Sequence, residues 1–218
     1  MEKFPTPKQT KKELAPDRQE KTPLEVESIN DGLGILLHRK ILYHGSNTAG
    51  IEKFNPAEED TVGSGLYLTS LAEDATKYAR YRAEQRKGNP VLYESQVENL
   101  RLLDLRDDAN IKKILPGFRN ILQAELEGHN LAWPKQATLT AALEKIDSGA
   151  VGAGNLREVA WSHGSAWTEY VKSLGYEGLV TYEGGEGPHA SNHESYIIFD
   201  PQKAQIIKEQ QVNQENEQ

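Results

Sequence analysis

Three short segments of the chain carry side chains that could act on a bound ligand. In the first, Tyr43-His44-Gly45-Ser46, a histidine follows an apolar run, so a strand would hold the imidazole while Gly45 lets a ligand approach the backbone. A histidine at a strand end is more often an incidental loop residue, so this segment gains weight only beside the others. The same letters recur at His163-Gly164-Ser165 in a helical pattern, and we expect no role for that copy.

The second segment, Gly63-Ser64-Gly65-Leu66-Tyr67-Leu68-Thr69-Ser70, leads into Ala75-Thr76-Lys77-Tyr78-Ala79. Tyr67 on an expected strand and Tyr78 on the following helix can face each other across a cleft and enclose a flat ring. The alternative is that both are core aromatics, which composition alone favours. Their combination with His44 and with the third segment shifts the balance toward a site.

The third segment, Asn192-His193-Glu194-Ser195-Tyr196-Ile197-Ile198-Phe199-Asp200-Pro201, puts a carboxylate at the start of an apolar strand. An isolated glutamate at such a position is usually a solvated edge residue. A metal site built on His189, His193 and Glu194 would need helical spacing, which the glycines and proline before it disfavour, so we expect no metal. The glycine-rich stretch 149–154 lacks the apolar strand and the Lys-Ser/Thr pair of a phosphate loop and is interpreted as a loop between helices.

The elements that must position these residues follow from the hydrophobic pattern. The expected strands are Ile41–Tyr43, Leu66–Leu68, Val91–Leu105 (long or bent), Gly178–Tyr182, Tyr196–Phe199 and an edge strand at Ala204–Ile207. A helix is expected where Ala72, Ala75, Tyr78, Ala79 and Arg82 recur at spacings of three and four. Three or four more helices are expected in the stretch from about 109 to 173.

This order of elements predicts an α+β fold in which the helices are segregated rather than alternating with strands. The folded domain is expected to span residues 38–207, with a helical insertion at about 109–173. Residues 1–37 are polar and predict a flexible N-terminal arm, and residues 208–218 predict a disordered tail, because neither can bury enough apolar surface to offset the entropy of ordering.

The composition narrows the class of protein. The chain has 218 residues, 37% of them hydrophobic, and no cysteine, which excludes a disulfide framework and a thiolate nucleophile. No apolar run is long enough for a membrane span or a secretory signal, so a cytoplasmic protein without a membrane partner is expected. A net charge of −8 makes nucleic acid an unlikely default partner.

Taken together, the three segments resemble the ADP-ribosyltransferases of the His-Tyr-Glu type. This family includes the diphtheria-toxin-like and poly(ADP-ribose) polymerase catalytic domains and their phage and plasmid relatives. The resemblance covers about 38–207 in element order, apart from helical stretches within 109–173. Its most specific part is the second segment, which aligns without gaps from Gly63 through Tyr78.

The resemblance implies split antiparallel β-sheets with NAD in the cleft between them. His44 would bind a ribose hydroxyl on the adenosine side, Gly45 would offer its backbone to the nicotinamide carboxamide, and Tyr78 would stack on the nicotinamide. Glu194 would stabilise the positive charge that develops on the ribose as the bond to nicotinamide breaks. Tyr67 would take the motif tyrosine position, with His44 and Glu194 as its catalytic partners. Further NAD contacts are expected from Ser46, Gly65, Thr69 and Ser195.

Two positions depart from the family pattern. Counting back from Asp200, the family glutamate aligns with Ser195, and because side chains alternate along a strand, Glu194 reaches the cleft only if the strand is bulged. Ala75 stands where the polymerases place a hydroxyl, for which Thr69, Ser70 and Thr76 are the candidate substitutes.

We therefore expect a mono-ADP-ribosyltransferase, a glycosyltransferase-class enzyme that moves ADP-ribose from NAD to a macromolecular acceptor and releases nicotinamide. A toxin or effector, including a phage-encoded one, suits this activity, and protein is the expected acceptor rather than nucleic acid. Two alternatives stay open. One is a non-catalytic NAD- or ADP-ribose-binding module, or inactive homologue, acting in protein interaction, which Ser195 favours. The other is a structural protein whose His44 and tyrosines are ordinary residues.

Overall fold

A computed structural model describes residues 26–28, 31–56, 62–128, 131–183 and 193–213. The strands are β1 (Val26–Ser28), β2 (Gly34–Ser46), β3 (Leu66–Thr69), β4 (Val91–Asp104), β5 (Gly178–Glu183), β6 (His193–Ile198) and β7 (Ala204–Gln211). The helices are α1 (Ala72–Arg86), α2 (Asp108–Gly128), α3 (Trp133–Asp147), α4 (Arg157–Ala160) and α5 (Gly164–Ser173), with short 3-10 turns η1 (Trp161–His163) and η2 (Pro201–Lys203). The predicted α+β class is confirmed.

The strands form one sheet that closes on itself. Their order is β1-β2-β3-β6-β5-β4-β7, and β2 also pairs with β4, so that β2, β3, β6, β5 and β4 make a closed β-ring. The antiparallel β2–β4 pair runs the whole length of β2. At one end of this pair β3 joins β2, with Tyr43 opposite Thr69, and at the other end β5 joins β4.

One strand pair differs from the expected all-antiparallel arrangement. β5 runs parallel to β4, with Leu102 opposite Gly178. A parallel pair needs a long crossover connection, and the helical segment between the two strands provides one. The remaining pairs are antiparallel: they form two groups, β1-β2-β4-β7 and β3-β6-β5, which the β2–β3 pair joins.

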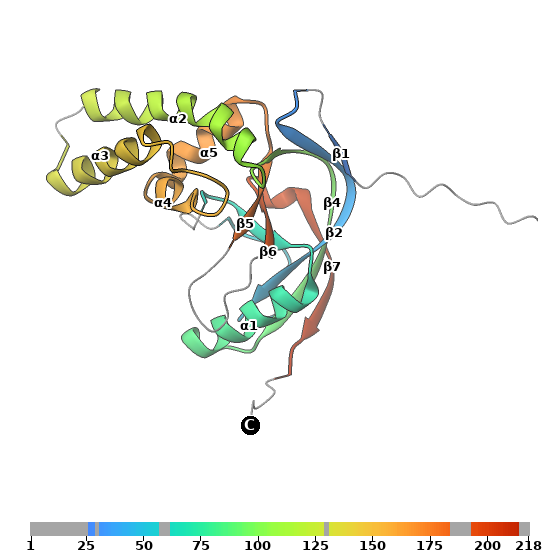
Figure 1. Cartoon of the computed structure of the whole chain (residues 1–218). Coiled ribbons are helices and arrows are strands. Elements are labelled where there is room, and N and C mark those ends of the chain that lie inside the picture. The colour runs from blue at the N-terminus through green and yellow to red at the C-terminus, as the bar shows by residue number, and fades with distance from the viewer. Residues whose placement is uncertain (1–25, 29–30, 57–61, 129–130, 184–192, 214–218) are drawn as a thin grey trace, which may run out of the picture.

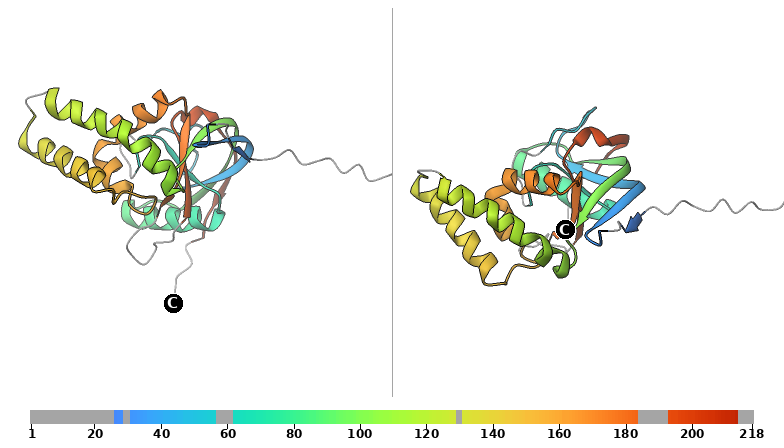
Figure 2. Two further views of the ribbon diagram at one scale, coloured as in Figure 1. Left: turned by 45° about the horizontal axis from the view of Figure 1, so that its top comes forward. Right: turned by 90° about the horizontal axis from the view of Figure 1, so that it is seen from above.

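The helices α2 to α5 lie between β4 and β5 in the sequence and gather on one side of the β-ring (Figures 1 and 2). Their core includes Phe118 and Trp167, whose ring centroids are 4.8 Å apart at nearly a right angle. A second core fills the β-ring and includes Leu42, Tyr93 and Tyr196. In the described part of the chain, no helix combines the length and apolar character needed to cross a membrane.

The folded part extends beyond the expected limits of 38 and 207. β1 and the first residues of β2 fall within the expected arm, where Leu37 is completely buried. The apolar residues at the start of β2 are removed from solvent because β2 pairs with β4 from Gly34 onward. At the other end β7 continues to Gln211 through pairing with β4. Residues 1–25 and 214–218 of the expected arm and tail lie outside the described residues.

Candidate functional site

A cavity of about 110 Å³ lies where β2, β3, α1, β5 and β6 meet. All three segments singled out in the sequence contribute to its wall. The lining residues are Tyr43, His44, Gly45, Tyr67, Leu68, Thr69, Asp74, Ala75, Tyr78, Glu183, His193 and Ser195.

His44 lies near the end of β2, and its ring is fixed on two sides. Nδ1 is 2.9 Å from the backbone oxygen of Tyr67, and Phe54 packs edge-on at a centroid distance of 5.0 Å. A carbonyl oxygen only accepts hydrogen bonds, so Nδ1 carries the proton and Nε2 is left as an acceptor. Burial lowers the pKa of His44, and the nearby charge of Arg82 lowers it further. The hydrogen bond to the Tyr67 backbone acts in the opposite direction but is outweighed, so the ring is neutral.

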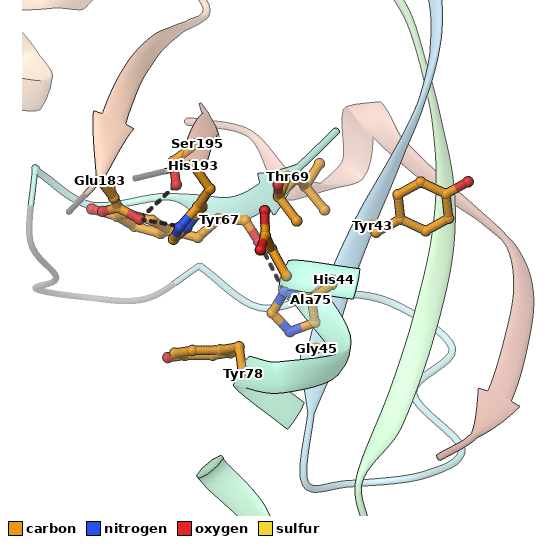
Figure 3. A pocket seen from close by; sticks show the side chains of 12 residues that line it. Tyr43, His44, Gly45, Tyr67, Thr69, Ala75, Tyr78, Glu183, His193 and Ser195 are labelled. Carbon is orange, nitrogen blue, oxygen red and sulfur yellow. Dashed lines mark hydrogen bonds and ion pairs between the residues drawn. The ribbon is translucent and has the colours of Figure 1, made fainter. Parts of the chain in front are cut away.

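Gly45 allows α1 to pack directly on β2. A Cβ atom at this position would collide with the backbone oxygen of Ala75, so a glycine is required for the close approach. The α1 residues that face β2, Ala75 and Ala79, are small and buried. Because Tyr78 lies between them in sequence, this packing fixes where its ring stands (Figure 3).

Tyr67 is held at the cavity by the loop that precedes β3. Its hydroxyl donates to the backbone oxygen of Gly63 at 2.8 Å and accepts from the backbone N–H of Val62 at 3.0 Å. The loop is in turn anchored to the helical segment, since the N–H of Ser64 donates to Oγ1 of Thr168 on α5 at 2.9 Å. In Figure 3, Tyr67 groups with Glu183, His193 and Ser195, whereas Tyr78 extends from α1 on the other side of the pocket and Tyr43 points away.

The alternation of β6 turns Glu194 away from the cavity. β6 pairs with β5 in continuous register from His193 to Ile198, so the bulge that Glu194 would have required is absent from this strand. Glu194 therefore points to the face that carries Tyr196, and its carboxylate accepts hydrogen bonds from Arg106 at 2.6 Å and from the Tyr196 hydroxyl at 3.0 Å. Partial burial raises its pKa, but these bonds outweigh the effect and the pKa lies below its ordinary value. The expectation that Glu194 reaches the cleft is wrong.

The carboxylate in the cavity comes from β5 instead. Glu183 lies opposite His193 in the β5–β6 pair, which puts its side chain on the same face as Ser195. The Ser195 hydroxyl donates to Oε2 of Glu183 at 2.6 Å, and Nε2 of His193 is 3.8 Å from the same oxygen. Sequence reasoning missed Glu183. The available signal was a carboxylate two residues after Thr181, at the end of a buried strand and directly before Gly184-Gly185.

The other sequence-predicted residues divide into two groups. The cavity brings together His44, Gly45, Tyr67, Thr69, Tyr78 and Ser195, along with Ala75. Ser46 and Gly65 do not line it. The Ser46 hydroxyl accepts from the N–H of Thr48 at 3.1 Å, and a Cβ at Gly65 would lie 2.9 Å from the backbone oxygen of Ile198, so this glycine allows β3 to approach β6. Of the candidate hydroxyls, Thr69 lines the cavity, while Ser70 and Thr76 do not.

The patterns given no function do not line the cavity, although Ala153 and Gly154 line a smaller neighbouring pocket that also includes Glu183. His163 is 8% exposed and packs among the helices, and the stretch 149–154 connects α3 to α4, where the N–H of Ala153 donates to Asp108 at 2.7 Å. Among the residues that the structure describes, no three histidine or carboxylate side chains gather as metal ligands. His189 and Asn192 lie outside that part of the chain.

Comparison with known proteins finds little. No family model and no curated protein matches the chain. One similar solved structure is a chain in the crystal structure of the M. tuberculosis MbcT–MbcA toxin–antitoxin complex. It is 11% identical with a TM-score of 0.48, and the alignment covers 84% of this chain and 89% of that one. The chemistry of the cavity therefore follows from its own residues.

Proposed function

We propose that the protein is an NAD-dependent mono-ADP-ribosyltransferase that transfers ADP-ribose to a macromolecular acceptor and releases nicotinamide. The observation that carries this proposal is the convergence in one cavity of a neutral imidazole, two tyrosines and a carboxylate, from His44, Tyr67, Tyr78 and Glu183. These groups come from four separate elements, so their meeting is a property of the fold and not of local sequence.

The residues divide the work of binding NAD. Tyr67 and Tyr78 enclose the nicotinamide ring, and the Gly45 backbone at the cavity wall pairs with its carboxamide. Nε2 of His44 accepts a hydrogen bond from a ribose hydroxyl on the adenosine side, a role that the neutral ring with its proton on Nδ1 can fill. Thr69 supplies the hydroxyl that Ala75 lacks.

Glu183 takes the role of the catalytic carboxylate. When the bond between ribose C1 and the nicotinamide nitrogen breaks, the electron pair leaves with nicotinamide and positive charge develops on the ribose. The Glu183 carboxylate stabilises that charge and accepts the proton that the attacking acceptor loses. Ser195 positions the carboxylate through its 2.6 Å hydrogen bond.

A comparison of two isosteric variants tests this assignment. Nicotinamide release and transfer of adenine-labelled ADP-ribose in a host lysate are measured for wild type, His44→Ala, Glu183→Gln and Glu194→Gln. Loss of one such electrostatic contact lowers turnover about 10²- to 10³-fold, which we expect for Glu183→Gln, whereas Glu194→Gln keeps most of its activity. Activity that survives in Glu183→Gln and disappears in Glu194→Gln would reverse the assignment of the carboxylate. Absence of nicotinamide release by wild type would refute the transferase.

A non-catalytic NAD-binding module is the second candidate. The observation that favours it is Ser195, a neutral side chain at the β6 position that faces the cavity. Such a module would bind NAD without releasing nicotinamide. A rise in melting temperature with NAD, together with unchanged NAD after prolonged incubation, would identify it.

A further inference from the structure

The solvent face of α1 carries aromatic and cationic side chains that continue outward from the cavity. Tyr78 and Tyr81 are 43% and 42% exposed, and their ring centroids are 6.5 Å apart at an interplanar angle of 41°. The Arg82 guanidinium lies 5.6 Å from the centroid of the Tyr78 ring. These three side chains, with Arg86 one turn beyond Arg82, are called the α1 platform here.

The charge around the platform opposes that of the whole molecule. From position 77 to 87 the helix and its C-cap carry five cations, Lys77, Arg80, Arg82, Arg86 and Lys87, against the single carboxylate of Glu84, in a chain of net charge −8. Lys77 is paired with Glu73 at 2.8 Å. Within the described ranges no carboxylate lies at ion-pair distance from Arg82, Arg86 or Lys87, and of these three Arg86 and Lys87 are exposed.

The platform is continuous with the cavity because Tyr78 belongs to both. Its ring lines the cavity, and the centroid of that ring is 6.5 Å from the Tyr81 ring and 5.6 Å from the Arg82 guanidinium. A flexible chain lying along α1 would therefore end beside Glu183 and Ser195, which stand across the pocket from Tyr78 (Figure 3).

We propose that the α1 platform binds single-stranded nucleic acid and presents it to the cavity as the acceptor of ADP-ribose. This inference rests on the proposed function. Exposed rings next to arginine form the stacking surface that unpaired bases use, and nearby cations hold the phosphates. An acidic peptide could use the cations but has no base to stack on the exposed Tyr81 ring. In the transfer step the bond from ribose C1 to nicotinamide breaks, a base nitrogen or hydroxyl oxygen bonds to C1, and its proton passes to Glu183.

Binding is tested first, without NAD, so that the result is independent of catalysis. The anisotropy of a fluorescent 12-nucleotide single strand is followed with wild type, Tyr81→Ala, Tyr81→Phe and Arg86→Ala. Losing one stacked base weakens binding roughly 5- to 150-fold, which we expect for Tyr81→Ala, while Tyr81→Phe keeps the ring and restores affinity. Loss of one phosphate contact in Arg86→Ala lowers the slope of log K against log salt by about 0.7. Lys113→Ala, an exposed position on α2, is the matched control and leaves binding unchanged.

The outcomes separate this inference from the proposed function. We expect adenine-labelled ADP-ribose to appear in the single-stranded RNA or DNA fraction and to decrease in Tyr81→Ala. NAD consumption without oligonucleotide binding, or with label in protein only, would overturn the platform and leave the transferase in place. Oligonucleotide binding without any NAD consumption would overturn the transferase, and with it the acceptor role, while the binding surface would remain.

Discussion

Ser195 on β6 and Glu183 on β5 together place a carboxylate in the cavity where a single glutamate on β6 could have done so. Ser195 leaves room in the cavity and offers a donor, and Glu183 from the neighbouring strand reaches across to accept at 2.6 Å. Alternation along β6 was predictable from sequence, since a slip of one residue inverts every side chain. The pairing of Glu183 with His193 was not predictable, because no local pattern shows which residues of β5 and β6 become neighbours.

At the same scale, buried histidines make stability depend on pH. Burial lowers the pKa of His163 from about 6.5, although Glu125 and the Thr138 backbone favour its charged form and Lys135 opposes it. As pH falls below about 6.5, the unfolded chain binds a proton that the folded chain does not, so folding stability decreases toward acid. We expect His163→Phe to show a smaller drop in melting temperature between pH 7.5 and 5.5 than wild type. The same drop in both proteins would contradict this role for His163, since His44 then accounts for the whole effect.

At the scale of elements, the contact between α1 and β2 sets the geometry of the cavity. The motif from Gly63 to Tyr78 correctly predicted β3 and α1, because apolar alternation and the spacing of small residues are local signals. Sequence reasoning also assigned Gly45 to the site, but for a different reason. Its missing side chain makes room for the α1 backbone, a contact between residues 30 positions apart that no local pattern reveals.

Adding one methyl group at this contact should therefore displace α1. Overpacking of this kind costs about 1–3 kcal/mol, which we expect for Gly45→Ala in urea unfolding, together with loss of the melting shift caused by NAD as Tyr78 moves. Gly128→Ala is the control, because a Cβ there meets no atom within 4 Å. An unchanged NAD shift in a destabilised Gly45→Ala would mean that α1 does not position the ligand.

At the scale of the whole molecule, edge strands added outside the β-ring explain why the sequence-based limits were too narrow. The strands at both ends of the described chain, β1 and β7, add to the β2–β4 pair. Their polar and mixed sequences resemble linkers when considered alone, and only the pairing with β2 and β4 supplies the missing hydrogen bonds. Apart from Ala204 and the partly buried Ile206, the side chains of β7 are exposed, which shows how little apolar signal such an edge strand needs.

Two shortened chains test the extent of the fold. A chain of residues 26–213 keeps every described strand, whereas one of residues 38–207 loses β1 and parts of β2 and β7. We expect the first to melt within a few degrees of the full chain and the second to lose its cooperative transition, since Ile35 and Leu37 are core residues. Circular dichroism during heating distinguishes them. A cooperative transition in the 38–207 chain at the wild-type temperature would show that the outer strands are dispensable.

The order in which the ring closes also bears on protein synthesis. His44, Tyr67 and Tyr78 are made first and Glu183 and Ser195 more than 100 residues later, and the cavity exists only when β6 has paired with both β3 and β5. Chains begin to fold from their N-terminal part while the ribosome is still adding residues. A nascent chain lacks the carboxylate side of the cavity until β5 and β6 have emerged, so the transferase that we propose could not act on NAD before that point.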